Sequence, residues 1–188
     1  QGFDSYDVFA KGSQTKKTGR ALEATLQAIA ETPEQPWFGF VHLMDVHAPY
    51  SVPDPYQSRF LDGRVSTVNA DTTVKFLHQN RSSRRNVSDQ QLDDLKAMYD
   101  GGVSFVDTRI AAIWDAVRTL ERPTIIVITA DHGEAFFERG YLGHGTFLYE
   151  PITRVPLIFW GPGIVPKGQH RATLASSVDL FPTLSALA

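Results

Sequence analysis

The chain contains no cysteine, so no disulfide framework can stabilise its 188 residues. It also lacks an apolar segment long enough to cross a membrane, internal repeats and low-complexity tracts. Neither sign of charge predominates: the formal net charge of −3 at pH 7 gives no reason to expect nucleic acid as a partner. With 42% hydrophobic residues the chain can bury a core, and we expect residues 1–188 to form a single globular unit.

Apolar residues recur at intervals of three and four residues in two segments, which predicts helices over residues 18–31 and 88–120. Ser88 to Gln91 have the form of a capping box at the start of the second helix. Gly101-Gly102 lie inside the same pattern, where we interpret them as a kink or a close approach to the sheet. Asp179 is predicted to cap a last helix.

Unbroken apolar runs predict buried strands at Trp37 to Leu43 and Thr124 to Thr129. A further strand is predicted over Arg154 to Trp160, where Pro156 favours an edge position or a late start. Helices and strands therefore alternate along the chain. This order favours an α/β fold with a mixed, largely parallel sheet and helices on both faces. If strands 37–43 and 124–129 are parallel in one sheet, a right-handed crossover should join them.

Asp131 and His132 directly follow the apolar run at Thr124 to Thr129, and a second imidazole, His144, follows in the same glycine-rich stretch. In open α/β sheets the ligand crevice lies at the carboxyl ends of the strands. A carboxylate and a neutral imidazole are ordinary ligands of a divalent cation, and Gly133 allows the chain to bend away sharply. The structural alternative is that Asp131 caps a following helix and His132 is an ordinary loop residue.

The run Trp37 to Leu43 ends in Met44-Asp45-Val46-His47-Ala48-Pro49-Tyr50, which repeats the order of strand, acid, histidine and proline-containing loop. Two strands would then direct histidines toward one edge of the sheet, which predicts that His47 belongs to the same site. The structural alternatives are that Asp45 bonds to backbone in a turn and that His42, inside the strand, is packed.

Four segments, taken in order, resemble the C-terminal part of the catalytic domain of sulfatases, within the alkaline phosphatase superfamily. They cover most of the chain outside residues 53–87. The segments are "FGFVHLMDVHAPY", "YDGGVSFVDTRIAAIWDAV", "ITADHGEAFFERGYLGHGTFLYEPITRVPLIFWGPG" and "SSVDLFPTL".

This resemblance implies roles for four residues. Asp131 and His132 match the later pair of metal ligands, and His47 matches an active-site histidine that contacts the sulfate or phosphate or its leaving oxygen. His144 matches a lysine or histidine position that touches the transferred group. The implied cofactor is a divalent cation, with Ca²⁺ as first choice and Mg²⁺, Mn²⁺ or Zn²⁺ as alternatives, and the implied substrate is an anionic sulfate or phosphate ester. A cation and imidazolium donors would stabilise the charge that gathers on the transferred group.

Two parts of the family pattern have no counterpart in the sequence. Sulfatases take their nucleophile from a Cys or Ser in a C/S-x-P-x-R motif. Without cysteine the cysteine-derived formylglycine cannot arise from this chain, and Ser51 to Pro55 begin like the motif but lack the arginine. The acidic pair of metal ligands is also missing, because Asp93-Asp94 lie in a helical pattern, where we interpret them as a solvated helix face.

Residues 53–87 are predicted to be a variable loop or insertion. In sulfatases this region often borders the substrate entrance, and Arg81, Arg84 and Arg85 would form a basic rim suited to an anionic substrate. The alternative is an exposed loop with solvated arginines.

Three functions stay open: a metal-dependent sulfuric ester hydrolase; a phosphoryl or phosphonate monoester hydrolase, or a phosphoethanolamine or phosphoglycerol transferase, of the same superfamily; and a fragment that is non-catalytic as given. The chain starts at Gln1 without a methionine or a signal-peptide pattern, so we expect an N-terminal half of the same protein as its partner. Similar sulfatases are mostly exported, which favours a periplasmic or secreted setting.

Overall fold

The computed structural model describes residues 7–8, 12–31, 34–79, 86–145 and 147–187. These residues fall into two compact units, described separately below. The first unit combines Gln1–Leu120 with Ala135–Gly143, and the second combines Glu121–Glu134 with His144–Ala188. The sequence-based expectation of one unit over residues 1–188 stays a prediction. None of the described helices is both long and apolar enough to cross a membrane.

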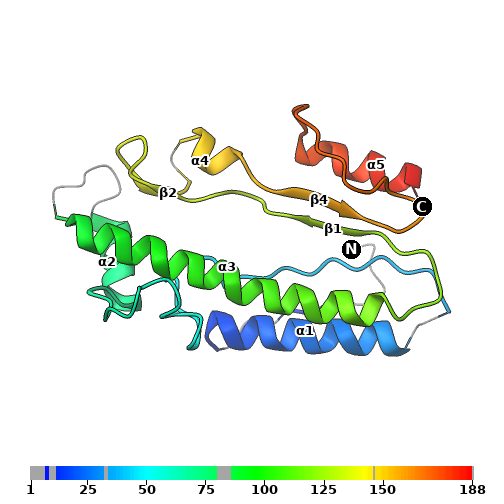
Figure 1. The fold of residues 1–188 in the computed structure, drawn as a ribbon, viewed down its shortest axis with the longest axis horizontal. Helices are drawn as coiled ribbons and strands as arrows, with labels where there is room; N and C mark the ends of the chain where they lie inside the picture. The colour runs from blue at the N-terminus through cyan, green and yellow to red at the C-terminus, as the bar shows by residue number, and fades with distance from the viewer. Residues whose placement is uncertain (1–6, 9–11, 32–33, 80–85, 146, 188) are drawn as a thin grey trace. The chain divides into compact units, whose positions relative to one another are not determined.

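The first unit contains three helices and a short hairpin among its described residues. α1 and α3 run side by side (Figure 1). β2 and β3 pair antiparallel, with Ala135 opposite Gly143. The elements are α1 (Gln14–Glu31), α2 (Ala70–Gln79), α3 (Asp89–Val117), β2 (Ala135–Phe136) and β3 (Leu142–Gly143).

The second unit is built on an antiparallel pair of strands, β1 and β4, in which Ile126 lies opposite Trp160 and Thr129 opposite Leu157 (Figure 1). Helical segments precede and follow β4 along the chain. The elements are β1 (Ile126–Thr129), α4 (Glu150–Thr153), β4 (Leu157–Trp160), the 3-10 turn η1 (Ser177–Asp179) and α5 (Leu180–Leu187).

Local sequence signals located α1 and α3 within a few residues. α3 begins after Ser88, whose hydroxyl accepts from the Gln91 backbone N–H at 3.2 Å while the Gln91 side chain accepts from the Ser88 N–H at 2.9 Å, so the predicted capping box is confirmed. Before the last helix, Ser176 caps the 3-10 turn η1, and the Asp179 carboxylate accepts from the Ser176 N–H at 2.9 Å. Asp179 directly precedes α5, and its predicted role as the cap of that helix stays a prediction.

The strand predictions have a mixed outcome. Thr124 to Thr129 do contain a strand, and β4 starts late, directly after Pro156. The strand predicted at Trp37 to Leu43 is wrong for the described structure, in which these residues form no sheet hydrogen bonds. Phe38 and Phe40 remain 63% and 75% exposed. A strand requires a hydrogen-bonded neighbour, and neither described sheet, β1–β4 or β2–β3, includes this segment.

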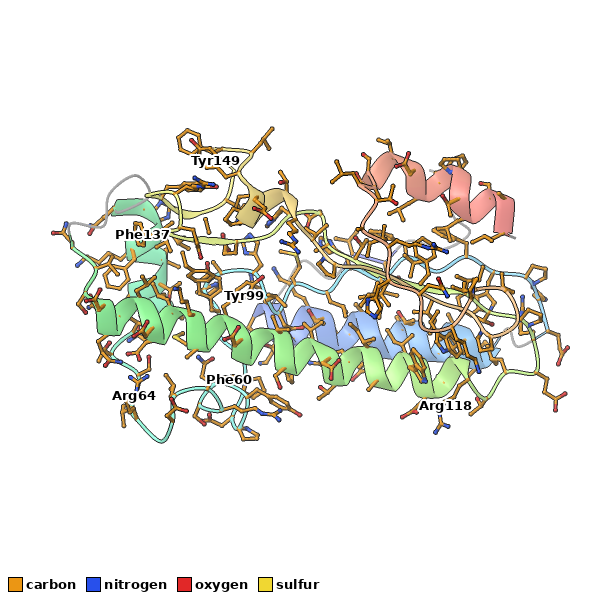
Figure 2. The ribbon with its side chains drawn as sticks, turned by 45° about the horizontal axis from the view of Figure 1, so that its top comes forward. Phe60, Arg64, Tyr99, Arg118, Phe137 and Tyr149 are labelled. Atoms are coloured by element: carbon orange, nitrogen blue, oxygen red, sulfur yellow. The ribbon has the colours of Figure 1, made fainter. Side chains whose placement is uncertain are left out.

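The main core of the first unit lies where α3 meets the segments on either side of α2 and the β2–β3 hairpin. At its centre three rings meet: the centroid of Tyr99 is 5.8 Å from that of Tyr50 and 5.3 Å from that of Phe136, both edge to face. Figure 2 shows Tyr99 on α3. The buried members are Tyr50, Val68, Phe76, Val87, Leu92, Leu95, Met98, Phe136 and Leu142.

Residues 53–87 contribute to this core. Val68 and Phe76 are buried in it, and residues 70–79 form α2, which the sequence pattern did not reveal. The interpretation of this region as an exposed loop is therefore wrong for residues 70–79, which form α2, whereas most of the described residues before α2 are exposed and not helical. The predicted basic rim of Arg81, Arg84 and Arg85 lies outside the described residues.

Asp94 also departs from its predicted place on a solvated helix face, because its side chain is fully buried. Oδ2 accepts from the Thr67 backbone N–H at 2.7 Å and its hydroxyl at 2.6 Å. Oδ1 accepts from Arg64 at 2.9 Å and from Gln90 at 2.8 Å. Arg64 lies on the chain segment below α3 in Figure 2. Burial by itself raises the pKa of Asp94, but these hydrogen bonds outweigh it and lower the pKa to about 2.

We predict that Asp94→Asn destabilises the protein by about 2 kcal/mol at pH 7, because a folded pKa below the unfolded value favours folding of the ionised form. The contribution is complete above the unfolded pKa, near 4, and is lost as the pH falls toward 2. Urea unfolding of wild type and variant across pH 2–7 measures this difference. Exposed Asp93→Asn is the matched control, with an expected change within about 0.5 kcal/mol. A constant gap between wild type and Asp94→Asn at every pH would contradict the assignment.

Candidate functional site

The loop that carries His47 is held by α3. A side chain at Gly102 would lie 3.2 Å from the Asp45 carbonyl oxygen and 3.3 Å from the Val46 Cα, and one at Gly101 would collide with the Tyr56 carbonyl. The glycine pair was predicted to mark a kink or a close approach to the sheet. It does mark a close approach, but to this loop, and α3 is unbroken through both residues. Only hydrogen fits at Gly101, and at Gly102 a side chain would have to displace the loop backbone by a few tenths of an ångström.

Asp45 and Tyr50 anchor the two ends of the loop, and both are buried. His47, between them, is half-buried, and its Nδ1 lies 2.8 Å from the Ala48 carbonyl oxygen. Asp45 does not make the predicted bond to turn backbone: neither oxygen of its carboxylate has a hydrogen-bond partner among the described residues. His42 is exposed, so its predicted packing is also absent.

Asp131 and His132 follow β1 directly, as predicted, in the second unit. His132 Nδ1 lies 2.8 Å from the Gly133 carbonyl oxygen, and because a carbonyl only accepts, Nδ1 carries the proton. Nε2 is then the nitrogen suited to a cation, and it lies 3.8 Å from Asp131 Oδ2. A histidine held through one nitrogen by a backbone carbonyl, with the other beside a carboxylate, is the usual arrangement of a metal-ligating imidazole. The residues therefore fit a divalent cation.

His144 lies against His132: the two rings are stacked with centroids 3.9 Å apart and planes 26° apart. His144 Nδ1 is 3.0 Å from Glu134 Oε1, and the Glu134 side chain is only 5% exposed. The carboxylate thereby fixes the orientation of the ring and favours a proton on Nδ1. Sequence reasoning missed Glu134. Glu134 lies in the same short stretch as Asp131 and His132, which was the only sequence signal for it. Its pairing with His144, ten positions later, cannot be inferred from the sequence.

Gly133 fixes the position of the loop that carries Asp131 and His132. Its N–H donates to the Ile152 carbonyl at 2.7 Å, and a side chain on Gly133 would collide with the Pro151 carbonyl. The predicted reason for glycine here was a sharp bend. The structure instead shows Gly133 in contact with the backbone of α4. The position therefore requires a residue without a Cβ atom, and the backbone freedom of glycine matters less.

Three of the four predicted site residues therefore lie together in the second unit, namely Asp131, His132 and His144, and His47 lies in the first. No group of three or more His, Cys, Asp or Glu side chains among the described residues is arranged to hold a metal ion. As predicted ligands, Asp131 and His132 would supply two donors, fewer than the four that Zn²⁺ takes or the six to eight that Ca²⁺ takes. The assignment of the four residues to one site stays a prediction.

Comparison with known proteins shows the family of the chain. The family model named Sulfatase matches residues 5–188. A sulfatase from Formosa agariphila is 29% identical over 152 residues, covering 80% of this chain and 28% of the relative. Arylsulfatase K from Xenopus laevis is 33% identical over 103 residues, covering 54% of this chain and 19% of the relative. The crystal structure of the phosphonate monoester hydrolase of Agrobacterium radiobacter matches with a TM-score of 0.63 at 25% identity, covering 85% of this chain and 36% of that one.

The described elements are therefore part of the mixed α/β fold of the alkaline phosphatase superfamily. Within that superfamily the chain belongs to the sulfatase family, as its sequence motifs predicted. The chain spans less than a third of the length of the two curated relatives.

We predict that Gly133→Ala destabilises the protein by about 1–3 kcal/mol, because the added methyl group must push the chain away from Pro151. Thermal unfolding monitored by circular dichroism measures the effect. Gly19→Ala on α1 is the matched control: its methyl group would meet only Arg109 at an ordinary 3.8 Å, and alanine favours a helix. Equal melting temperatures for wild type and Gly133→Ala would show that the close contact is not a constraint.

Proposed function

We propose that the whole protein is a metal-dependent sulfuric ester hydrolase and that this chain supplies one wall of its active site. The observation that carries the proposal is the cluster of Asp131, His132 and His144 at the end of β1. In it a carboxylate oxygen lies 3.8 Å from one imidazole nitrogen, and a second imidazole is stacked on the first. Membership of the sulfatase family supports the same reaction class.

In this proposal the Asp131 carboxylate and His132 Nε2 hold a divalent cation, with Ca²⁺ as the first choice and Mg²⁺, Mn²⁺ or Zn²⁺ as alternatives. The Asp131 side chain is 75% exposed, so its oxygens are accessible to such an ion. The cation would supply positive charge to the oxygens of the sulfuryl group. The further metal ligands and the nucleophile are assigned to the rest of the protein, because the sequence contains neither the C/S-x-P-x-R motif nor an acidic pair after a strand.

His144 and His47 have the chemistry to assist transfer of the group. With Nδ1 of His144 directed at Glu134, Nε2 is the atom that would meet the substrate, as a hydrogen-bond donor when the ring is protonated. Such a donor stabilises charge on the sulfuryl oxygens more in the transition state than in the ground state, and it can also protonate the departing alkoxide. His47 would act in the same way through its own Nε2.

The alternative is a phosphoryl or phosphonate monoester hydrolase, or a transferase, that uses the same residues. The TM-score of 0.63 to a phosphonate monoester hydrolase supports this alternative. The same residues could serve it, because sulfate ester and phosphonate ester hydrolysis both transfer a tetrahedral anionic group.

The ratio of kcat/KM for p-nitrophenyl sulfate to kcat/KM for p-nitrophenyl phenylphosphonate, measured with the whole protein, separates the sulfatase proposal from this alternative. The higher value for the sulfate supports the proposal, and the reverse order supports the alternative. The isolated chain, which offers only two metal ligands, is expected to turn over neither ester.

We predict that Asp131→Asn in the whole protein lowers kcat/KM for p-nitrophenyl sulfate on the order of 100-fold or more and lowers bound metal in parallel, because it removes a charged ligand. Elemental analysis of dialysed protein and steady-state kinetics measure the two effects. Asp107→Asn, an exposed site on α3, serves as the control and should change neither. Lost activity with unchanged metal content and affinity would show that Asp131 is not a ligand.

A further inference from the structure

We propose that Gln14, the first residue of α1, is a positioning residue for His47. By holding the Ala48 carbonyl it keeps the neutral imidazole protonated on Nδ1 and directs Nε2 toward the transferred group. This inference rests on the proposed assignment of His47 to the active site. It adds a residue 33 positions away in the sequence that no motif suggested.

Three atoms meet at this point. Gln14 Nε2 donates to the Ala48 carbonyl oxygen at 2.9 Å and lies 3.4 Å from His47 Nδ1. His47 Nδ1 is itself 2.8 Å from the same carbonyl oxygen. All three groups are half-buried, so their hydrogen bonds are partly shielded from competing water.

These distances decide the tautomer. If Nδ1 carried no proton, its lone pair would face the carbonyl lone pairs at 2.8 Å, and the Gln14 amide, at a long 3.4 Å, would be a poor donor to it. If Nδ1 is protonated, it donates to the carbonyl, which accepts from Gln14 through its second lone pair. The second arrangement satisfies every group. The proton of neutral His47 therefore lies on Nδ1, and Nε2 is the nitrogen that can take up or deliver a proton.

The contact belongs to a wider attachment of the His47 loop to the N-terminal end of α1. The hydroxyl of buried Thr18 accepts from the Met44 N–H at 3.3 Å, just before the loop, and the Thr15 hydroxyl donates to the Ser51 carbonyl at 3.5 Å, just after it. Gln14 therefore acts at the middle of a segment whose two ends are already attached. Removing its amide should change the orientation of the Ala48 carbonyl without releasing the loop.

The test uses the whole protein with ring-¹⁵N-labelled histidine at a pH where the imidazoles are neutral, with the His47 signals assigned by their absence in His47→Gln. Wild type should show the Nδ1–H tautomer. Gln14→Met keeps the side-chain size but removes the donor, so it should move the signals toward a mixture of tautomers and lower kcat/KM on the order of 10-fold. Gln27→Met, at an exposed α1 position where the amide donates to Glu31 at 2.7 Å, is the matched control and should change neither.

An unchanged tautomer in Gln14→Met, or an Nε2–H tautomer in wild type, would overturn the proposal. The NMR readout does not depend on turnover. Absence of sulfate ester hydrolysis by the wild-type protein would therefore count against the proposed function alone, while the tautomer of His47 would still decide the role of Gln14.

Discussion

Close approach of backbone segments at glycine positions is the constraint on which both candidate loops depend. Gly102 lets α3 lie against Asp45 and Val46, and Gly133 lets the loop after β1 lie against Pro151. Interiors are packed densely, so a loop pressed against a helix or turn at such a point has little freedom to move. The histidines are thereby carried on loops whose positions are fixed by backbone contacts, and their side chains need only be oriented.

Polar groups orient the side chains on these loops. Three buried carboxylates show that the role of a buried acid depends on its hydrogen-bond partners. Asp94 accepts four hydrogen bonds and holds residues 64–67 to α3, so it acts in stability. Glu134 orients the ring of His144, which is a candidate active-site residue. Asp45 is as deeply buried, yet has no hydrogen-bond partner among the described residues. A buried carboxylate is stabilised by donors or a counter-charge, so its partners decide whether it strengthens the fold or directs a site.

Features encoded locally were predictable, and those that depend on distant residues were not. The capping box at Ser88 and the apolar run of β1 are read from a few adjacent residues, and both predictions held. Whether Trp37 to Leu43 form a strand depends on a neighbour, which periodicity cannot reveal. An aspartate in a helical pattern looks the same whether it is solvated or, like Asp94, bonded to Thr67 far along the chain. Asp131 and His132 were proposed from their residue types, whereas Glu134 and Gln14 could be proposed only from the geometry.

The central claim is that Asp131 and His132 hold a divalent cation in a sulfatase active site. Its most direct test is a crystal structure of the whole protein grown with Mn²⁺, with the ion located by anomalous scattering. We expect one peak bonded to an Asp131 carboxylate oxygen and to His132 Nε2, at distances of about 2.0–2.3 Å. A peak bonded to neither residue, or to His132 Nδ1 with the Gly133 contact broken, would contradict the account.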